Sequence, residues 1–110
     1  MRFAMISVDS TDGVRLAVHE LGTPDTDAPP LLLCHATGFH AAVWEPLAAG
    51  LDGAHRWALD FRGHGASPIA DGTDLGWDAI ATDVLAVVDA LDVPPGQLVG
   101  VGHSMGGACL

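Results

Sequence analysis

The stretch that decides the fold is residues 97–110, which read QLVGVGHSMGGACL. The apolar run at 97–103 is typical of a strand, and the small residues from position 104 onward begin a helix. Across the junction, Gly102, His103, Ser104, Met105 and Gly106 form the pattern G-x-S-x-G. A serine on such a strand-to-helix turn projects its hydroxyl above the carboxyl ends of the strands, at the positive end of the helix. We therefore predict that Ser104 is a nucleophile.

The two glycines of this pattern have a steric reason. Because the chain reverses within a few residues, side chains at Gly102 and Gly106 would collide with neighbouring backbone. Two other interpretations are a turn with an idle serine and a phosphate-binding loop. The second is disfavoured, because Met105 takes the third glycine position of G-x-G-x-x-G and no lysine follows as in a P-loop.

Strands and helices alternate in the sequence before this turn. The hydropathy pattern predicts strands at 3–8 and 14–20, which form an N-terminal hairpin, then strands at 31–35, 55–61 and 97–103. Helices are predicted at 43–51 and 77–91, with a last helix beginning after 103. This order predicts an α/β fold, with a mostly parallel sheet after the hairpin and helices on both faces.

The helix at 77–91 has the clearest periodicity. Its apolar stripe is Trp77, Ile80, Ala81, Val84, Leu85, Val88 and Leu91. The three tryptophans, Trp44, Trp57 and Trp77, are predicted to lie in the core or in a cleft wall, with the core favoured.

Composition excludes several classes of function. Fourteen acidic residues face four arginines without any lysine, and the net charge of −10 disfavours nucleic acid and anionic membrane surfaces as partners. The acids are interpreted as a solvated surface. No apolar run is long enough for a membrane span, and no metal-ligand spacing occurs, so we expect no metal and no membrane partner. Two cysteines in apolar surroundings, Cys34 and Cys109, suit a reducing compartment, and we expect a cytoplasmic protein.

Three segments, LLLCHATGFH at 31–40, ALDFRGHGAS at 58–67 and VGVGHSMGGA at 99–108, resemble the α/β-hydrolase superfamily. The resemblance covers essentially the whole chain and implies a serine hydrolase that cleaves an ester-like carbonyl substrate through an acyl-enzyme on Ser104. It also implies an oxyanion hole made by the backbone N–H groups of Thr37 and Met105, although Ala36 replaces the usual glycine. His35 and His103 are expected to support the loops and not to act as the base.

The resemblance bears on domain organisation too. In this superfamily the triad acid and histidine follow the serine along the chain. Residues 1–110 are therefore expected to be the N-terminal portion of a single domain, truncated just after the nucleophile turn, and inactive alone. We expect a small-molecule substrate and no cofactor, with the oligomeric state left open. Alternatives are a cofactor-free acyltransferase or perhydrolase-like haloperoxidase, and a ligand-binding protein without activity. A dinucleotide-binding module is disfavoured by the glycine pattern.

Overall fold

The computed structural model describes residues 4–22, 28–50, 54–94 and 96–110. Its strands are β1 (Ala4–Asp9), β2 (Arg15–Gly22), β3 (Leu31–Cys34), β4 (Arg56–Asp60) and β5 (Val99–Gly102). Its helices are α1 (Glu45–Ala49), α2 (Trp77–Leu91) and α3 (Met105–Cys109), with short 3-10 turns η1 (Thr11–Gly13) and η2 (Ala41–Trp44). The predicted alternation of strands and helices is confirmed.

The described strands form one sheet in the order β1-β2-β4-β3-β5. The hairpin strand β2 pairs antiparallel with both β1 and β4. Beyond the hairpin, β4, β3 and β5 run parallel, with Cys34 opposite both Leu59 and Gly102. Because parallel strands end at the same edge, the chain that follows β3, β4 and β5 gathers at one end of the sheet.

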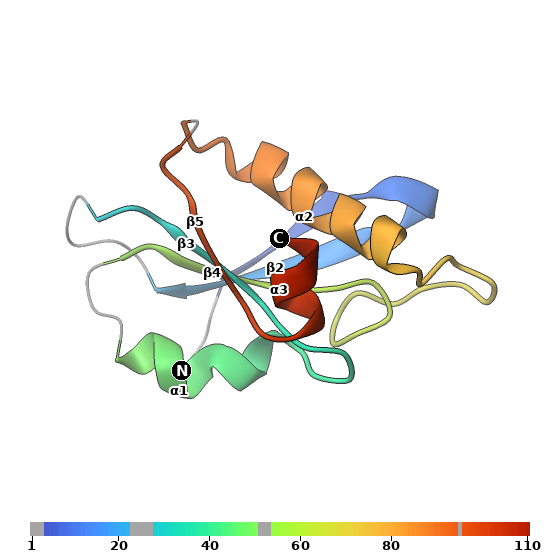
Figure 1. Ribbon diagram of the computed structural model, residues 1–110, viewed down its shortest axis with the longest axis horizontal. Coiled ribbons are helices and arrows are strands. Elements are labelled where there is room, and N and C mark those ends of the chain that lie inside the picture. Colours follow the sequence, from blue (N-terminus) through green and yellow to red (C-terminus); the bar gives the residue numbers. More distant parts are fainter. Residues whose placement is uncertain (1–3, 23–27, 51–53, 95) are drawn as a thin grey trace.

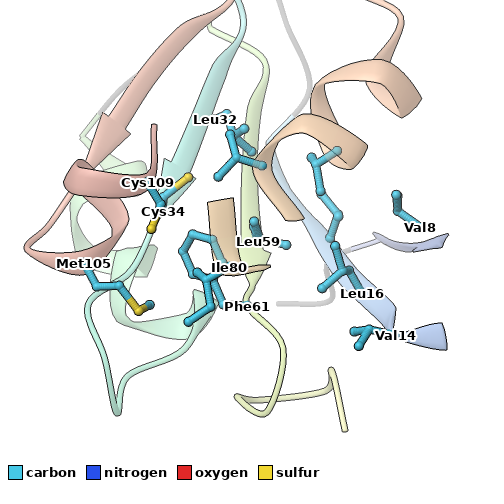
Figure 2. Close-up of a cluster of buried hydrophobic side chains, with 13 residues drawn as sticks. Val8, Val14, Leu16, Leu32, Cys34, Leu59, Phe61, Ile80, Met105 and Cys109 are labelled. Atoms are coloured by element: carbon cyan, nitrogen blue, oxygen red, sulfur yellow. The ribbon is translucent and has the colours of Figure 1, made fainter. Parts of the chain in front are cut away.

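Helices cover both faces of the sheet, as predicted (Figure 1). On one face, α2 and α3 pack on side chains such as Leu32, Leu59 and Phe61, and Figure 2 shows this core. On the other face, η2 and α1 pack over Leu33 and Ala58. Alternate strand residues therefore serve two separate cores, which explains why β3 is apolar at every position.

The predicted helix at 43–51 differs from the structure in its beginning. The chain first makes the 3-10 turn η2 and then continues as α1, with Pro46 in the first turn. A proline is tolerated there because the first N–H groups of a helix have no partner within it. Residues 51–53 lie outside the described part.

The predicted apolar stripe of α2 is partly wrong. Trp77 and Leu85 are 57% and 67% exposed, whereas the buried face contains Ile80, Asp83 and Val84. Hydropathy assigns a carboxylate to the solvent side, but Asp83 has an arginine partner from another element and is buried with it. Trp77 is thus not a core residue, whereas Trp44 and Trp57 are partly buried against the two cores.

The strand β5 lies at the edge of the described sheet. It pairs only with β3 among the described strands, and three of its four residues are exposed. Its other edge is unpaired within the described residues.

Candidate active site

Ser104 occupies the turn between β5 and α3, and it is exposed. Its backbone has φ 54° and ψ −114°, a conformation that residues other than glycine rarely adopt. The turn is closed by hydrogen bonds from the Gly106 N–H to the His103 carbonyl at 3.0 Å and from the Ala108 N–H to the Ser104 carbonyl at 3.0 Å. The geometry holds the serine side chain outward at the carboxyl end of the parallel strands.

The close approach of backbone at this turn excludes side chains at two positions. A Cβ added at Gly106 would overlap the carbonyl oxygen of Cys34, at the end of β3. A Cβ at Gly102 would overlap the backbone of Gly107. The turn is also tied to β3 by the His103 N–H, which donates to the Cys34 carbonyl at 3.1 Å. Glycine is needed at 102 and 106 because β3, β5 and α3 meet there without space between them.

Thr37 and Met105 are brought into contact from positions 68 residues apart. The Thr37 hydroxyl donates to the Met105 sulfur, with Oγ1 and Sδ 3.2 Å apart. Thr37 is exposed, whereas the Met105 side chain is buried in the core under α2. Within the described residues, neither the Thr37 N–H nor the Met105 N–H donates a hydrogen bond. Two unused backbone donors therefore lie in adjacent segments beside Ser104.

His35 is fully buried directly after β3. Its Nδ1–H donates to the Ala36 carbonyl at 2.7 Å, and its Nε2 accepts from the Phe61 N–H at 3.1 Å. Burial lowers the pKa of His35 below its ordinary value, outweighing the Ala36 carbonyl, which acts in the opposite direction. With both ring nitrogens bonded to backbone, His35 joins the loops after β3 and β4.

His103, unlike His35, lies at the surface. It is exposed, and its ring faces the half-exposed ring of Phe39, with centroids 6.3 Å apart. This ring contact joins the loop after β3, which carries Phe39, to the serine turn, which carries His103. All six histidines are described, and none forms a hydrogen bond with the Ser104 side chain.

Sequence reasoning missed Asp60, which was placed among the solvated acids. Its side chain is buried and accepts from the Ala41 N–H at 2.7 Å, from the Ala66 N–H at 3.0 Å and from His19 Nε2 at 2.7 Å. Burial alone would raise the pKa of Asp60, but these hydrogen bonds outweigh it and lower the pKa. The signal available in the sequence was an aspartate placed directly at the carboxyl end of an apolar strand.

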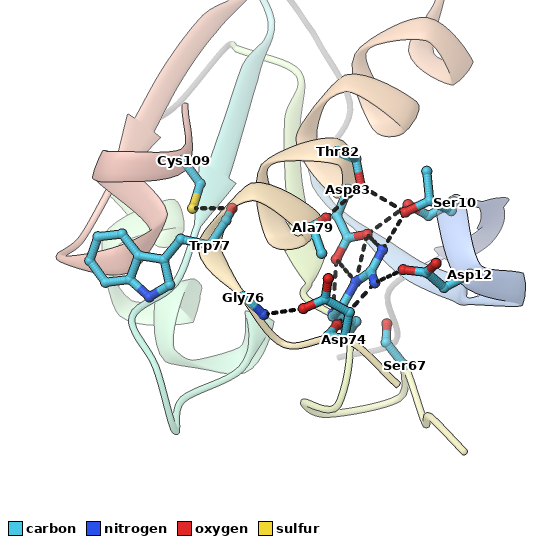
Figure 3. A network of polar contacts seen from close by, with 12 residues as sticks. Ser10, Asp12, Ser67, Asp74, Gly76, Trp77, Ala79, Thr82, Asp83 and Cys109 are labelled. Carbon is cyan, nitrogen blue, oxygen red and sulfur yellow. Dashed lines mark hydrogen bonds and ion pairs between the residues drawn. The ribbon is translucent and has the colours of Figure 1, made fainter. Parts of the chain in front are cut away.

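Asp83 was missed in the same way. It is fully buried with Arg62, whose Nη2 lies 2.9 Å from Asp83 Oδ1 (Figure 3). Arg62 also donates to Asp12 and to Thr11 at 2.8 Å each, so it links the hairpin turn to α2. The carboxylate of Asp83 raises the pKa of Arg62. These contacts fix the shape of the loop after β4.

The loop after β4 is held by a second buried group. The Ser67 hydroxyl donates to the Asp60 carbonyl at 2.6 Å and accepts from the Ala17 N–H at 2.8 Å. The Nδ1–H of His64 donates to the Arg62 carbonyl at 2.9 Å, and the His64 ring lies beside that of His35, with centroids 5.0 Å apart.

The described residues contain no group of three or more His, Cys, Asp or Glu side chains arranged to hold a metal ion. None of the described helices is long and apolar enough to cross a bilayer. Cys34 and Cys109 are free and buried, and burial raises the pKa of the Cys34 thiol to about 12. A thiol with that pKa stays protonated near neutral pH and is a poor nucleophile. Cys34 therefore acts as a small apolar side chain beside the serine turn.

Comparison with known proteins places these features in a family. Residues 31–110 match the Alpha/beta hydrolase family. The chain is 39% identical over 88 residues to protein phosphatase methylesterase 1 of Bos taurus, an alignment covering 76% of this chain and 23% of that protein.

Two solved structures have the same fold. A bacterial membrane phospholipase A superposes with a TM-score of 0.81 at 29% identity, over 97% of this chain and 33% of that one. The haloalkane dehalogenase DbeA of Bradyrhizobium elkani superposes with a TM-score of 0.82 at 22% identity, over 98% of this chain and 35% of that one. The chain thus spans about a quarter to a third of the length of these proteins. The match over residues 31–110 shows that the chain belongs to the alpha/beta hydrolase family.

Proposed function

We propose that this chain carries the nucleophile and the oxyanion donors of a serine hydrolase that cleaves ester-like carbonyl substrates. The observation that carries the proposal is the exposed Ser104 in a strained conformation, with φ 54° and ψ −114°. Strain of this kind costs about 1–3 kcal/mol and is concentrated at functional sites. Both a methylesterase and a phospholipase among the similar proteins act on esters, which supports this substrate class.

The proposed reaction has two stages. A histidine removes the proton of the Ser104 hydroxyl as its oxygen attacks the carbonyl carbon, and the resulting oxyanion accepts hydrogen bonds from the Thr37 and Met105 N–H groups. The tetrahedral intermediate then collapses to the acyl-enzyme, and the leaving oxygen receives the proton from the histidine and departs as the alcohol. Water, deprotonated by the same histidine, hydrolyses the acyl-enzyme and restores the Ser104 hydroxyl.

We propose that the acid and the histidine are supplied by sequence beyond Leu110, in a single domain of which residues 1–110 are the N-terminal portion. The chain order of the triad in this family supports the proposal. So does the absence of a hydrogen bond between Ser104 and any histidine described here. The exposed, one-sided pairing of β5 is further support, because it leaves an edge on which a sheet can continue.

The proposal includes a small-molecule substrate, no nucleic-acid or membrane partner, and no cofactor. The net charge of −10 supports the exclusion of nucleic acid as a partner. It also includes a reducing, cytoplasmic location, which the two buried free thiols support.

A fluorophosphonate probe tests the nucleophile. The full-length protein is expected to become labelled, and the Ser104→Ala variant is expected to stay unlabelled. Ser7→Ala, which removes an exposed serine from β1, is the matched control and keeps full labelling. Equal labelling of wild type and Ser104→Ala refutes Ser104 as the nucleophile.

Product analysis tests the reaction class. With water as the acyl acceptor, the expected product of an ester substrate is the free acid. Preferential formation of a new ester or a peracid, when an alcohol or peroxide is added, would favour the acyltransferase or perhydrolase-like alternative.

A further inference from the structure

The loop after β3 contacts the serine turn through two side chains, Thr37 and Phe39. Among the described residues, the Thr37 hydroxyl makes the only side-chain hydrogen bond between residues 35–40 and α3, to the Met105 sulfur at 3.2 Å. The Phe39 ring lies beside that of His103, and the His103 N–H donates to the Cys34 carbonyl, but both of these contacts are made before α3 begins. Among the described residues of this loop, Thr37 is thus the one whose side chain is hydrogen-bonded to α3.

The two ends of this contact differ in burial. Thr37, Gly38 and Phe39 are exposed, and Gly38 has φ +83° with nothing near the place of a side chain. Met105 is 1% exposed and packs among Phe61 and other core residues (Figure 2). A buried methionine sulfur is a fixed point, although a thioether is a weak acceptor. The hydroxyl thus fastens an exposed loop to the core.

We propose that the Thr37 hydroxyl is a positioning group for the oxyanion hole. By holding Thr37 against Met105, it keeps the backbone N–H groups of these two residues aimed at one oxygen atom. This inference rests on the proposed function, and it adds a role for the side chain of Thr37 beside that of its backbone. Donors that are held in place before the reaction stabilise the transition state without reorganisation.

Thr37→Val and Thr37→Ser separate the hydroxyl from the shape of the side chain. Valine keeps the branched shape and removes the donor, whereas serine keeps the donor. With an activated ester and the full-length protein, Thr37→Val is expected to lower kcat about 3- to 10-fold, a small part of the loss of about 100-fold or more that follows when an oxyanion donor is removed outright. KM is expected to stay within about twofold, because the lost interaction acts on the transition state. Thr37→Ser, which restores the donor, is expected to recover most of the kcat that Thr37→Val loses.

Met105→Leu removes the acceptor and conserves volume, so it provides a second route to the same test. It is expected to lower kcat to the same degree as Thr37→Val. In the double variant the loss is expected to equal that of either single variant, because both substitutions remove one interaction. The methyl NMR signal of Met105, in protein labelled at methionine methyl groups, is expected to move in Thr37→Val and to keep its wild-type position in Thr37→Ser.

Three results would overturn the inference. One is wild-type kcat in Thr37→Val, the second is an equal loss in Thr37→Val and Thr37→Ser, and the third is additive losses in the double variant. Each of these leaves the proposed function intact as long as the probe labels wild type and not Ser104→Ala. Equal labelling of wild type and Ser104→Ala refutes the proposed function and this inference together, so the two failures are distinguishable.

Discussion

The guanidinium of Arg62 and the carboxylate of Asp83 form a fully buried ion pair, with Nη2 and Oδ1 2.9 Å apart across 21 residues of sequence. Asp83 also accepts from the Ser10 hydroxyl at 2.6 Å, so the pair joins α2 to the hairpin turn and to the loop after β4. Removal of one member leaves the other charge buried without its partner, which is the costly case for a buried ion pair.

Asp83→Ala is therefore expected to lower the free energy of unfolding by about 3–5 kcal/mol, measured by urea denaturation of the full-length protein. Asp89→Ala, on the exposed side of the same helix, is the matched control and is expected to change stability by less than about 0.5 kcal/mol. The double variant Arg62→Met/Asp83→Leu is expected to regain most of the loss, because no charge remains buried. Equal stability of Asp83→Ala and Asp89→Ala would contradict the prediction.

Adjacent glycines in α3 are expected to respond differently to alanine. Gly106→Ala places a Cβ onto the Cys34 carbonyl, so β3 and α3 must separate. At Gly107 the nearest atom to an added Cβ is the Gly102 carbonyl oxygen at 3.4 Å, which is ordinary contact. We expect Gly106→Ala to lower the thermal midpoint by about 5 °C or more, corresponding to about 1–3 kcal/mol of overpacking, and Gly107→Ala to be neutral or stabilising. Calorimetry of both variants checks this, and the reverse order would disprove it.

Strain at Ser104 predicts that glycine is better than alanine at that position. With φ 54° and ψ −114°, alanine keeps the strain of the native serine, whereas glycine adopts this conformation readily. Ser104→Gly is expected to be more stable than Ser104→Ala by about 1 kcal/mol in chemical denaturation. Ser7 in β1 is an ordinary strand position, and there the alanine variant is expected to be more stable than the glycine variant. A Ser104→Ala variant as stable as Ser104→Gly would show that the turn is not strained.

Stability is expected to fall as the pH drops below about 6.5, through His35. Burial lowers the pKa of His35 in the folded state, so the unfolded chain binds a proton that the folded chain does not. The resulting stability is fully present above the unfolded pKa and is lost as pH falls towards the folded pKa. Urea denaturation between pH 7.5 and pH 5 measures the slope. In His35→Gln, which keeps a donor and an acceptor without titrating, the part of the slope due to His35 is expected to vanish. An unchanged slope would contradict the assignment.

How much of the site could be predicted depended on how local its causes are. The pattern around Ser104 identified the strand-to-helix turn, because five consecutive residues specify it. The glycines were expected for steric reasons, but the obstacle at Gly106 is the carbonyl of Cys34, which only the pairing of β3 with β5 brings there. The Thr37 to Met105 contact spans 68 residues and has no local signal.

The contrast between local signals and distant contacts also explains why hydropathy assigned two buried acids to the surface. Asp60 and Asp83 were interpreted as solvated because a pattern within one segment assigns every carboxylate to the surface. Whether a carboxylate can be buried depends on the donors that other segments bring to it, and for Asp60 these come from β2, η2 and the loop after β4.

By itself, the sequence determined the order of strands and helices, the parallel sheet behind a hairpin, and the serine turn. These follow from hydrophobic periodicity and turn chemistry, which act between near neighbours in the chain. Only the tertiary structure decided which face of α2 is buried, that the Cys34 carbonyl meets Gly106, and which polar groups meet in the core. Those outcomes depend on partners distant in sequence, since a buried charge or a close backbone approach is tolerated only where its neighbour is supplied.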